Sequence, residues 1–158
     1  MALNIRRVVT GHDARGRAVV TFDDTLSNFV SKRSGHNSCV VWTTDTAPAD
    51  NSGDFDAATR KVGTELPGGT VFRIIEFGPG VSPRNHRTNS VDYAVVLSGE
   101  IDMDLDGTVV HLKQGDVLVQ RGTIHNWINR GSVPCVMAFV LVDAKPAEAG
   151  GQILQPTG

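Results

Sequence analysis

The chain has 158 residues, a formal net charge of −2 at pH 7 and 20% charged residues, which is ordinary for one globular domain. The nearly balanced charge excludes an electrostatic case for a nucleic-acid partner or an anionic membrane surface. No apolar run is long enough to cross a bilayer, and the first residues lack the order of a secretory signal, so we expect a cytoplasmic protein.

Short β-branched runs separated by Gly, Pro, Asn and Asp predict an all-β protein, either a sandwich or a barrel. The expected strands, in chain order, are Arg6–Thr10, Ala18–Phe22, Cys39–Thr43, Thr70–Phe77, Val91–Leu97, Ile101–Leu105, Thr108–Leu112, Val117–Val119, His125–Ile128 and Cys135–Val142. The turn between the first two strands predicts that the chain opens with a hairpin.

Two long segments show no strand pattern. Residues 44–69 are rich in Asp, Ala, Ser, Thr and Gly, and we expect a surface loop with one helical turn near Ala57–Lys61. Loops of this length often act as covers of a site or as arms between subunits. The tail after Asp143 is expected to be frayed.

One hairpin can be predicted to the residue. Asp106-Gly107 is a strong signal for a two-residue type I′ turn. Counting outward from this turn pairs Asp102 with His111 on one face and apolar residues on the other, Met103 with Val110 and Ile101 with Leu112. We therefore interpret His111 as a solvated cross-strand partner of Asp102.

The segments Gly80–Gly99 and Gly115–Asn129 each bring a histidine, His86 or His125, onto an expected strand. Strand alternation places certain residues on common faces. A barrel interior that received these residues would hold a polar cluster beside an aromatic wall, as ligand pockets do. The residues are His86, Thr88, Asp92, His125, Trp127 and Asn129. His36 could cap such a pocket if the segment before Cys39 folds over it.

These two segments resemble the two signature motifs of the cupin superfamily. The first motif is a glycine, five residues, His-x-His, three or four residues, Glu, six residues and a glycine; the chain keeps this frame with Gly80, His86, Thr88, Asp92 and Gly99. The second motif is matched by Gly115-Asp116, Gly122, His125 and Asn129, with Gln120 where proline is usual.

The resemblance covers Thr70–Val142 and implies a small RmlC-like cupin: an all-β, double-stranded β-helix, or jelly-roll barrel, with an N-terminal β extension. On this basis we expect one structural domain in three parts. Residues 1–69 would form the extension and the long loop packed on the barrel, 70–143 the barrel core, and 144–158 the tail.

The resemblance also implies a candidate metal site. Typical cupins bind a divalent metal through His, His, Glu and His, and the matching positions here hold His86, Thr88, Asp92 and His125. Two imidazoles and a carboxylate are the donor set of a facial triad, whereas a threonine hydroxyl is a poor ligand. Both a pocket with one metal ion, such as Fe, Zn, Ni or Mn, and a metal-poor pocket remain open.

Without a metal, His86, Asp92 and His125 form an acid–base set, because a carboxylate can orient a neighbouring histidine and raise its basicity. We expect Thr88 and Asn129 to hold a carbonyl or hydroxyl group of the substrate, and Trp127 to form a wall. Arg121 would either clamp a substrate carboxylate or lie solvated at the rim.

The function expected from these residues is that of a small-molecule cupin enzyme, a lyase or isomerase that dehydrates, decarboxylates or isomerises a small oxygenated substrate. A metal-dependent dioxygenase and a non-catalytic small-molecule-binding cupin are the alternatives. A homodimer is expected, through edge strands or the N-terminal hairpin, because an exposed sheet edge has to be paired or covered.

Overall fold

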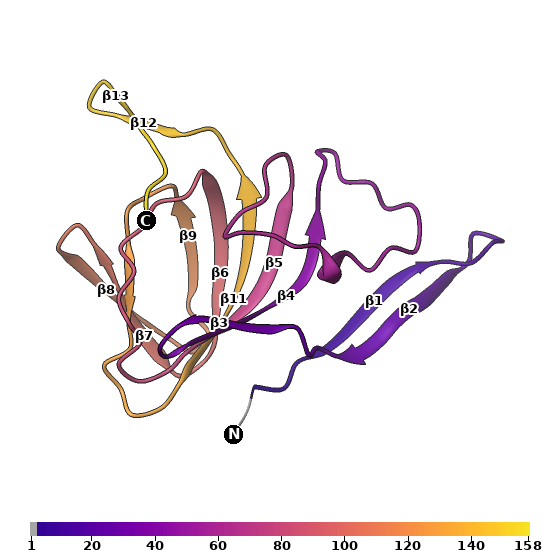
Figure 1. Ribbon diagram of the computed structural model, residues 1–158, viewed down its shortest axis with the longest axis horizontal. Coiled ribbons are helices and arrows are strands. Elements are labelled where there is room, and N and C mark those ends of the chain that lie inside the picture. The colour runs from indigo at the N-terminus through magenta and orange to yellow at the C-terminus, as the bar shows by residue number, and fades with distance from the viewer. Residues whose placement is uncertain (1–2) are drawn as a thin grey trace.

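The computed structural model describes residues 3–158 and consists almost entirely of strands (Figure 1). These are β1 Arg6–His12, β2 Ala18–Thr25, β3 Phe29–Arg33, β4 His36–Thr44, β5 Thr70–Phe77, β6 Ser90–Ser98, β7 Glu100–Leu105, β8 Thr108–Lys113, β9 Val117–Arg121, β10 Asn126–Ile128, β11 Cys135–Asp143, β12 Ala147–Ala149 and β13 Gln152–Leu154. The described helix is a single 3-10 turn, η1 Ala57–Thr59, where a helical turn was expected. No helix within residues 3–158 is long and apolar enough to span a membrane.

Two antiparallel sheets form the jelly-roll barrel. The larger sheet has the strand order β3-β4-β5-β11-β6-β9, and the smaller one the order β10-β7-β8. Strand β11 comes late in the sequence yet lies between β5 and β6, which is the kind of crossing that a jelly roll requires. The expected all-β barrel of the double-stranded β-helix type is confirmed.

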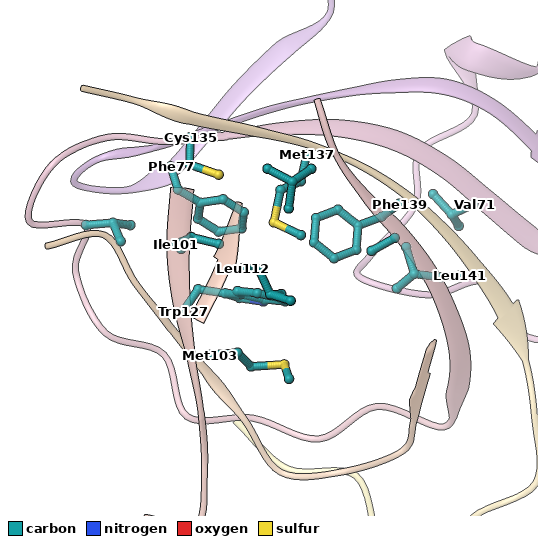
Figure 2. Packing of buried hydrophobic residues seen from close by; sticks show 13 residues of the cluster. Val71, Phe77, Ile101, Met103, Leu112, Trp127, Cys135, Met137, Phe139 and Leu141 are labelled. Carbon is teal, nitrogen blue, oxygen red and sulfur yellow. The ribbon is translucent and has the colours of Figure 1, made fainter. Parts of the chain in front are cut away.

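The main core lies between the two sheets, and strand alternation explains it. In β6, Ala94 and Val96 are buried, whereas Tyr93, Val95 and Leu97 point outward and are exposed. Inward-facing residues of the other strands complete the core, and Figure 2 shows how their side chains gather. They include Val71, Phe77, Ile101, Met103, Trp127, Met137, Phe139 and Leu141.

The β7–β8 hairpin has the predicted register. Asp102 lies opposite His111, and the carboxylate accepts a hydrogen bond from Nδ1 of His111 at 2.8 Å. Asp106 and Gly107 have φ values of 50° and 90°, and a type I′ turn needs positive φ at both positions. The turn therefore fixes which face of the hairpin meets the core.

The hairpin of β1 and β2 projects from one end of the barrel (Figure 1). Its inner end is held by Arg7, whose guanidinium donates to the carboxylates of Asp24 and Asp56. Asp56 also caps η1 by accepting from the backbone N–H of Ala58 at 3.0 Å. One arginine thus joins the N-terminal hairpin to the long segment 44–69.

Two parts of the prediction were wrong or incomplete. Strand β3 was not expected, although it pairs with β4 and forms an edge of the larger sheet. The tail is not frayed: β12 and β13 form a hairpin whose turn contains Gly150 and Gly151, both with positive φ. Beyond it, Thr157 exchanges two backbone hydrogen bonds with Arg87, which returns the tail to the barrel.

Candidate functional site

His86 and His125 face each other at the centre of the site. Each donates its backbone N–H to the carbonyl of the other at 3.0 Å, in an isolated antiparallel bridge. Directly opposed residues of such a bridge project to the same face, and the centroids of the two rings are 4.1 Å apart. Both side chains are buried. The fold therefore joins the histidines of the two motifs into one pair.

A hydrogen bond to a backbone carbonyl defines the tautomer of His86. Nδ1 of His86 lies 3.0 Å from the carbonyl oxygen of Arg84, and Nδ1 of His125 lies 3.1 Å from that of Thr123. A carbonyl can only accept, so Nδ1 of His86 carries the hydrogen and its Nε2 the lone pair. Burial, together with the nearby His125, lowers the pKa of His86 to about 4, and burial also lowers the pKa of His125. Both rings are neutral bases at neutral pH.

Gln120 distinguishes the two histidines. Its amide nitrogen lies 2.7 Å from Nδ1 and 3.1 Å from Nε2 of His125. Its buried amide oxygen has no hydrogen-bond partner among the described residues. No hydrogen bond within residues 3–158 engages Nε2 of His86. The lone pair of His86 is therefore the more available of the two.

A chain of polar side chains lies on the inner face beside the histidines. Ser90 Oγ donates to Asp92 Oδ1 at 2.6 Å and lies 2.8 Å from the hydroxyl of Thr88. All three residues are buried. Burial raises the pKa of Asp92, against the opposing effects of the bond from Ser90 and the charge of Arg73. Ser90 was not predicted, although alternation places it on the same face as Thr88 and Asp92.

A small cavity opens over the histidine pair. The space open to the centres of water molecules is about 70 Å³, enough for roughly five waters at about 10–15 Å³ each. Its apolar wall includes Phe77, Trp127 and Phe139, with the Trp127 centroid 5.7 Å from each of the other two. The cavity thus suits a small molecule, and Trp127 lines it as expected.

The cavity also has residues that sequence reasoning did not assign to it. His36, which the sequence suggested as a cap of the pocket, also lines the cavity. Four cationic residues do so as well, and none of them was predicted: Lys32, Arg33, Arg73 and Arg84. Only Arg73 carried a signal, as the one charged residue on the face of β5 that also carries Phe77.

Three residues expected to bind substrate do not line the cavity. Arg121 is exposed on β9 and does not line the cavity; the preceding Gln120 takes the inward position. The side-chain nitrogen of Asn129 donates to the carbonyls of Phe77 and Val133, so its amide holds a loop. Thr88 is buried next to Ser90 and does not line the cavity either.

The expected metal donors do not come together as a cluster. Among residues 3–158, no group of three or more His, Cys, Asp or Glu side chains is arranged to hold a metal ion. His86 and His125 are paired, but the carboxylate of Asp92 is directed to Ser90. The donor set of a facial triad is therefore not assembled among residues 3–158.

Comparison with known proteins agrees with this fold. Residues 73–142 match the cupin domain family. The chain is 41% identical to phomopsin biosynthesis cluster protein C′ of Diaporthe leptostromiformis, over 94% of this chain and 83% of that protein. It is 35% identical to the cupin-domain-containing oxidoreductase fogC of Aspergillus ruber, over 94% and 77%.

Solved structures support the fold alone, because their identity to the chain is low. The structure of KdgF from Halomonas sp. has a TM-score of 0.50 at 15% identity, over 73% of this chain and 86% of that one. An RmlC-like cupin from Shewanella frigidimarina has a TM-score of 0.50 at 14% identity, over 73% and 83%. From its motifs, its barrel and its relatives, the chain belongs to the cupin superfamily.

Proposed function

We propose that this cupin is an enzyme that moves protons on a small oxygenated molecule, as a lyase or an isomerase. The observation that carries the proposal is the state of His86: its Nδ1 hydrogen is used by the carbonyl of Arg84, and its Nε2 lone pair is free beside a cavity. A neutral imidazole held in one tautomer is a suitable general base at neutral pH.

The same residues suggest a course for the reaction. His86 takes a proton from a carbon next to a carbonyl group, and the electron pair moves onto the carbonyl oxygen as an enolate. Return of the proton to another atom completes an isomerisation, whereas loss of a hydroxyl group completes a dehydration. Asp92, whose pKa is raised by burial, is the second group that can give or take a proton.

The surroundings support this chemistry. Phe77, Trp127 and Phe139 keep water away from one side of the cavity, which strengthens electrostatic interactions within it. His125 lies against His86 and is held by Gln120, so it fixes the position of the base. The curated relatives named for biosynthesis clusters and for oxidoreductases favour a small-molecule enzyme over a purely structural protein.

Deuterium exchange tests the proposal without knowledge of the natural substrate. The protein would be incubated in D₂O with a panel of small 2-oxo and 3-oxo acids, and the loss of C–H signals followed by NMR. We expect exchange in the native protein and a loss of about 10²-fold or more in His86→Gln. Exchange that is unchanged in His86→Gln would contradict the assigned role of this residue.

A second candidate function is oxidation of a small molecule, because the relative from Aspergillus ruber and three others are named cupin-domain-containing oxidoreductases. A metal-dependent dioxygenase, the alternative that the sequence left open, belongs to this class. The same panel would be followed for oxygen uptake with and without added Fe²⁺. Uptake that requires iron, in the absence of exchange, would favour oxidation, and binding without either reaction would favour a non-catalytic cupin.

A further inference from the structure

The cavity carries an excess of positive charge. Only one carboxylate of the described residues lines it, that of Asp92, whereas the lining includes four cations: Lys32, Arg33, Arg73 and Arg84. No ion pair within residues 3–158 engages Lys32, Arg33 or Arg73. Arg84 donates to an oxygen of Gly158 at 2.8 Å. A buried or partly buried charge without a counter-charge is costly, so the arrangement favours a ligand that supplies negative charge.

Arg33 and Arg73 are held in place by neutral groups. Nε of Arg33 donates to the carbonyl of Ser82 at 2.9 Å. One terminal nitrogen of Arg73 donates to the carbonyls of Gly63 and Thr64 at 2.7 and 2.9 Å. Carbonyl oxygens fix a guanidinium without neutralising it, and each guanidinium has five N–H donors in a rigid fork. Donors therefore remain for a ligand.

Arg73 shows the excess most clearly. Only 8% of it is exposed, and its Nε is buried without a hydrogen-bond partner among the described residues. Burial lowers the pKa of both Arg73 and Arg33. The charge of Asp92 opposes this effect at Arg73, and the charge of Arg84 adds to it at both. The charges of Arg33, Arg73 and Arg84 also converge on His36, where all three lower its pKa. Three guanidiniums thus act on one small space.

We propose that the ligand of this cavity is a small carboxylic acid whose carboxylate is bound by Arg33 and Arg84 in front of Arg73. This inference deepens the proposed function and rests on it for the reaction, though not for the binding. Guanidinium groups match the planar carboxylate through two parallel hydrogen bonds. The body of the acid lies on the wall of Phe77 and Trp127, which brings its carbon atoms next to His86.

A phosphate group would satisfy the same donors, so the test has to distinguish the two anions. The dimensions of the cavity and its apolar wall favour a carboxylate attached directly to a short carbon skeleton. The probes are acetate, crotonate and benzoate, each compared with its neutral amide, and inorganic phosphate. Binding is measured by isothermal titration calorimetry at low salt, and Trp127 fluorescence gives a second readout.

We expect at least one of these acids to bind 10-fold or more tightly than its amide, and phosphate to bind more weakly than that acid. Arg33→Gln and Arg84→Gln should each weaken binding of the acid by 10-fold or more and leave binding of the amide unchanged. Arg121→Gln is the matched control, because this arginine is exposed outside the cavity. Near-ultraviolet circular dichroism confirms that each variant is folded.

Three results would overturn the proposal: equal affinity for acid and amide, unchanged affinity for the acid in both Arg33→Gln and Arg84→Gln, or no binding of any acid up to 50 mM. This concentration is about 100-fold above the KM values that are ordinary for small substrates. Phosphate that binds more tightly than every acid would reassign the subsite to phosphate. Acid binding that persists in His86→Gln, where exchange is lost, supports both proposals. Acid binding without exchange in the native protein refutes the proposed reaction alone.

Discussion

Replacing Arg7 by methionine tests how the N-terminal hairpin is held to the barrel. The side chain of Arg7 is 2% exposed and donates four hydrogen bonds, two to Asp24 and two to Asp56. Methionine keeps part of the apolar stem and removes every donor. The two carboxylates would then face each other without the cation between them.

The expected loss follows from the exposure of the partners. A buried ion pair that loses one partner costs about 3–5 kcal/mol, but Asp24 and Asp56 are 45% and 26% exposed and can regain water. The bonds to Asp24 are discounted toward the value of a surface pair, about 0–1 kcal/mol. The bonds to Asp56 then dominate, and we expect a loss of about 2–3 kcal/mol in the free energy of unfolding.

Urea unfolding followed by tryptophan fluorescence measures this loss. Trp42 reports on the hairpin directly, because its ring lies 6.5 Å from that of Phe22 on β2. Arg6→Met is the matched control: Arg6 makes the same bidentate contact with Asp23, but its side chain is 71% exposed. We expect no measurable change in this control. Equal losses in the two variants, or none in Arg7→Met, would refute the reasoning.

The same contact predicts a dependence on pH. Arg7 lowers the pKa of Asp56, so the unfolded chain binds a proton at a higher pH than the folded one. The stabilisation is therefore complete above the unfolded pKa, about 4, and is lost as the pH falls through the lower folded value. Arg7→Met should lose less stability over this acid range than the native protein does.

Three further predictions concern the cavity and the surface. Burial and the cavity arginines lower the pKa of His36 from 6.5 to about 4, so the free energy of unfolding should decrease as the pH falls from 6.5 to 4. Urea unfolding should show a smaller decrease over this range in His36→Gln. Because the carboxylate of Asp92 accepts a hydrogen bond from Ser90, Asp92→Ala should leave the affinity for Zn²⁺, measured by calorimetry, unchanged. A 10-fold loss of affinity would show that Asp92 is a metal ligand. Val119, exposed on the edge strand β9, belongs to an apolar face that a homodimer would cover. Light scattering should show that the native protein is a dimer and that Val119→Lys is a monomer. Val109→Lys, the control at an exposed valine of β8, should remain a dimer. A monomeric native protein would contradict this expectation.

The barrel could be predicted because its signals are local. Period-2 alternation marked the buried face of β6, and the pair Asp106-Gly107 fixed the register of one hairpin. The two glycine-punctuated motifs likewise placed His86 and His125 on expected strands that could contribute to one pocket. The bridge between them brings the two side chains together, since opposed residues of an antiparallel pair project to the same face.

The charge of the cavity could not be predicted, because topology creates it. Lys32 and Arg33 come from β3, a strand that was not expected although Ser34-Gly35 is a turn signal between it and β4. Arg84 comes from the irregular segment before His86. Asn129 shows the opposite error. Strand alternation correctly predicted that Asn129 is buried, but it could not predict its hydrogen-bond partners. Its amide nitrogen, which was expected to bind a substrate, donates to two backbone carbonyls instead.

The segment 44–69 is divided by its contacts into two halves with different prospects for protein engineering. The ion pair of Asp45 and Arg60, 2.9 Å long, closes the base of an outer half, and residues 45–55 within it are all exposed. The inner half is tied to the barrel wall through Arg73. A peptide tag or fluorescent reporter inserted within residues 49–53 would therefore be carried on a closed surface loop, away from the cavity, and such exposed loop tips are where insertions are best tolerated.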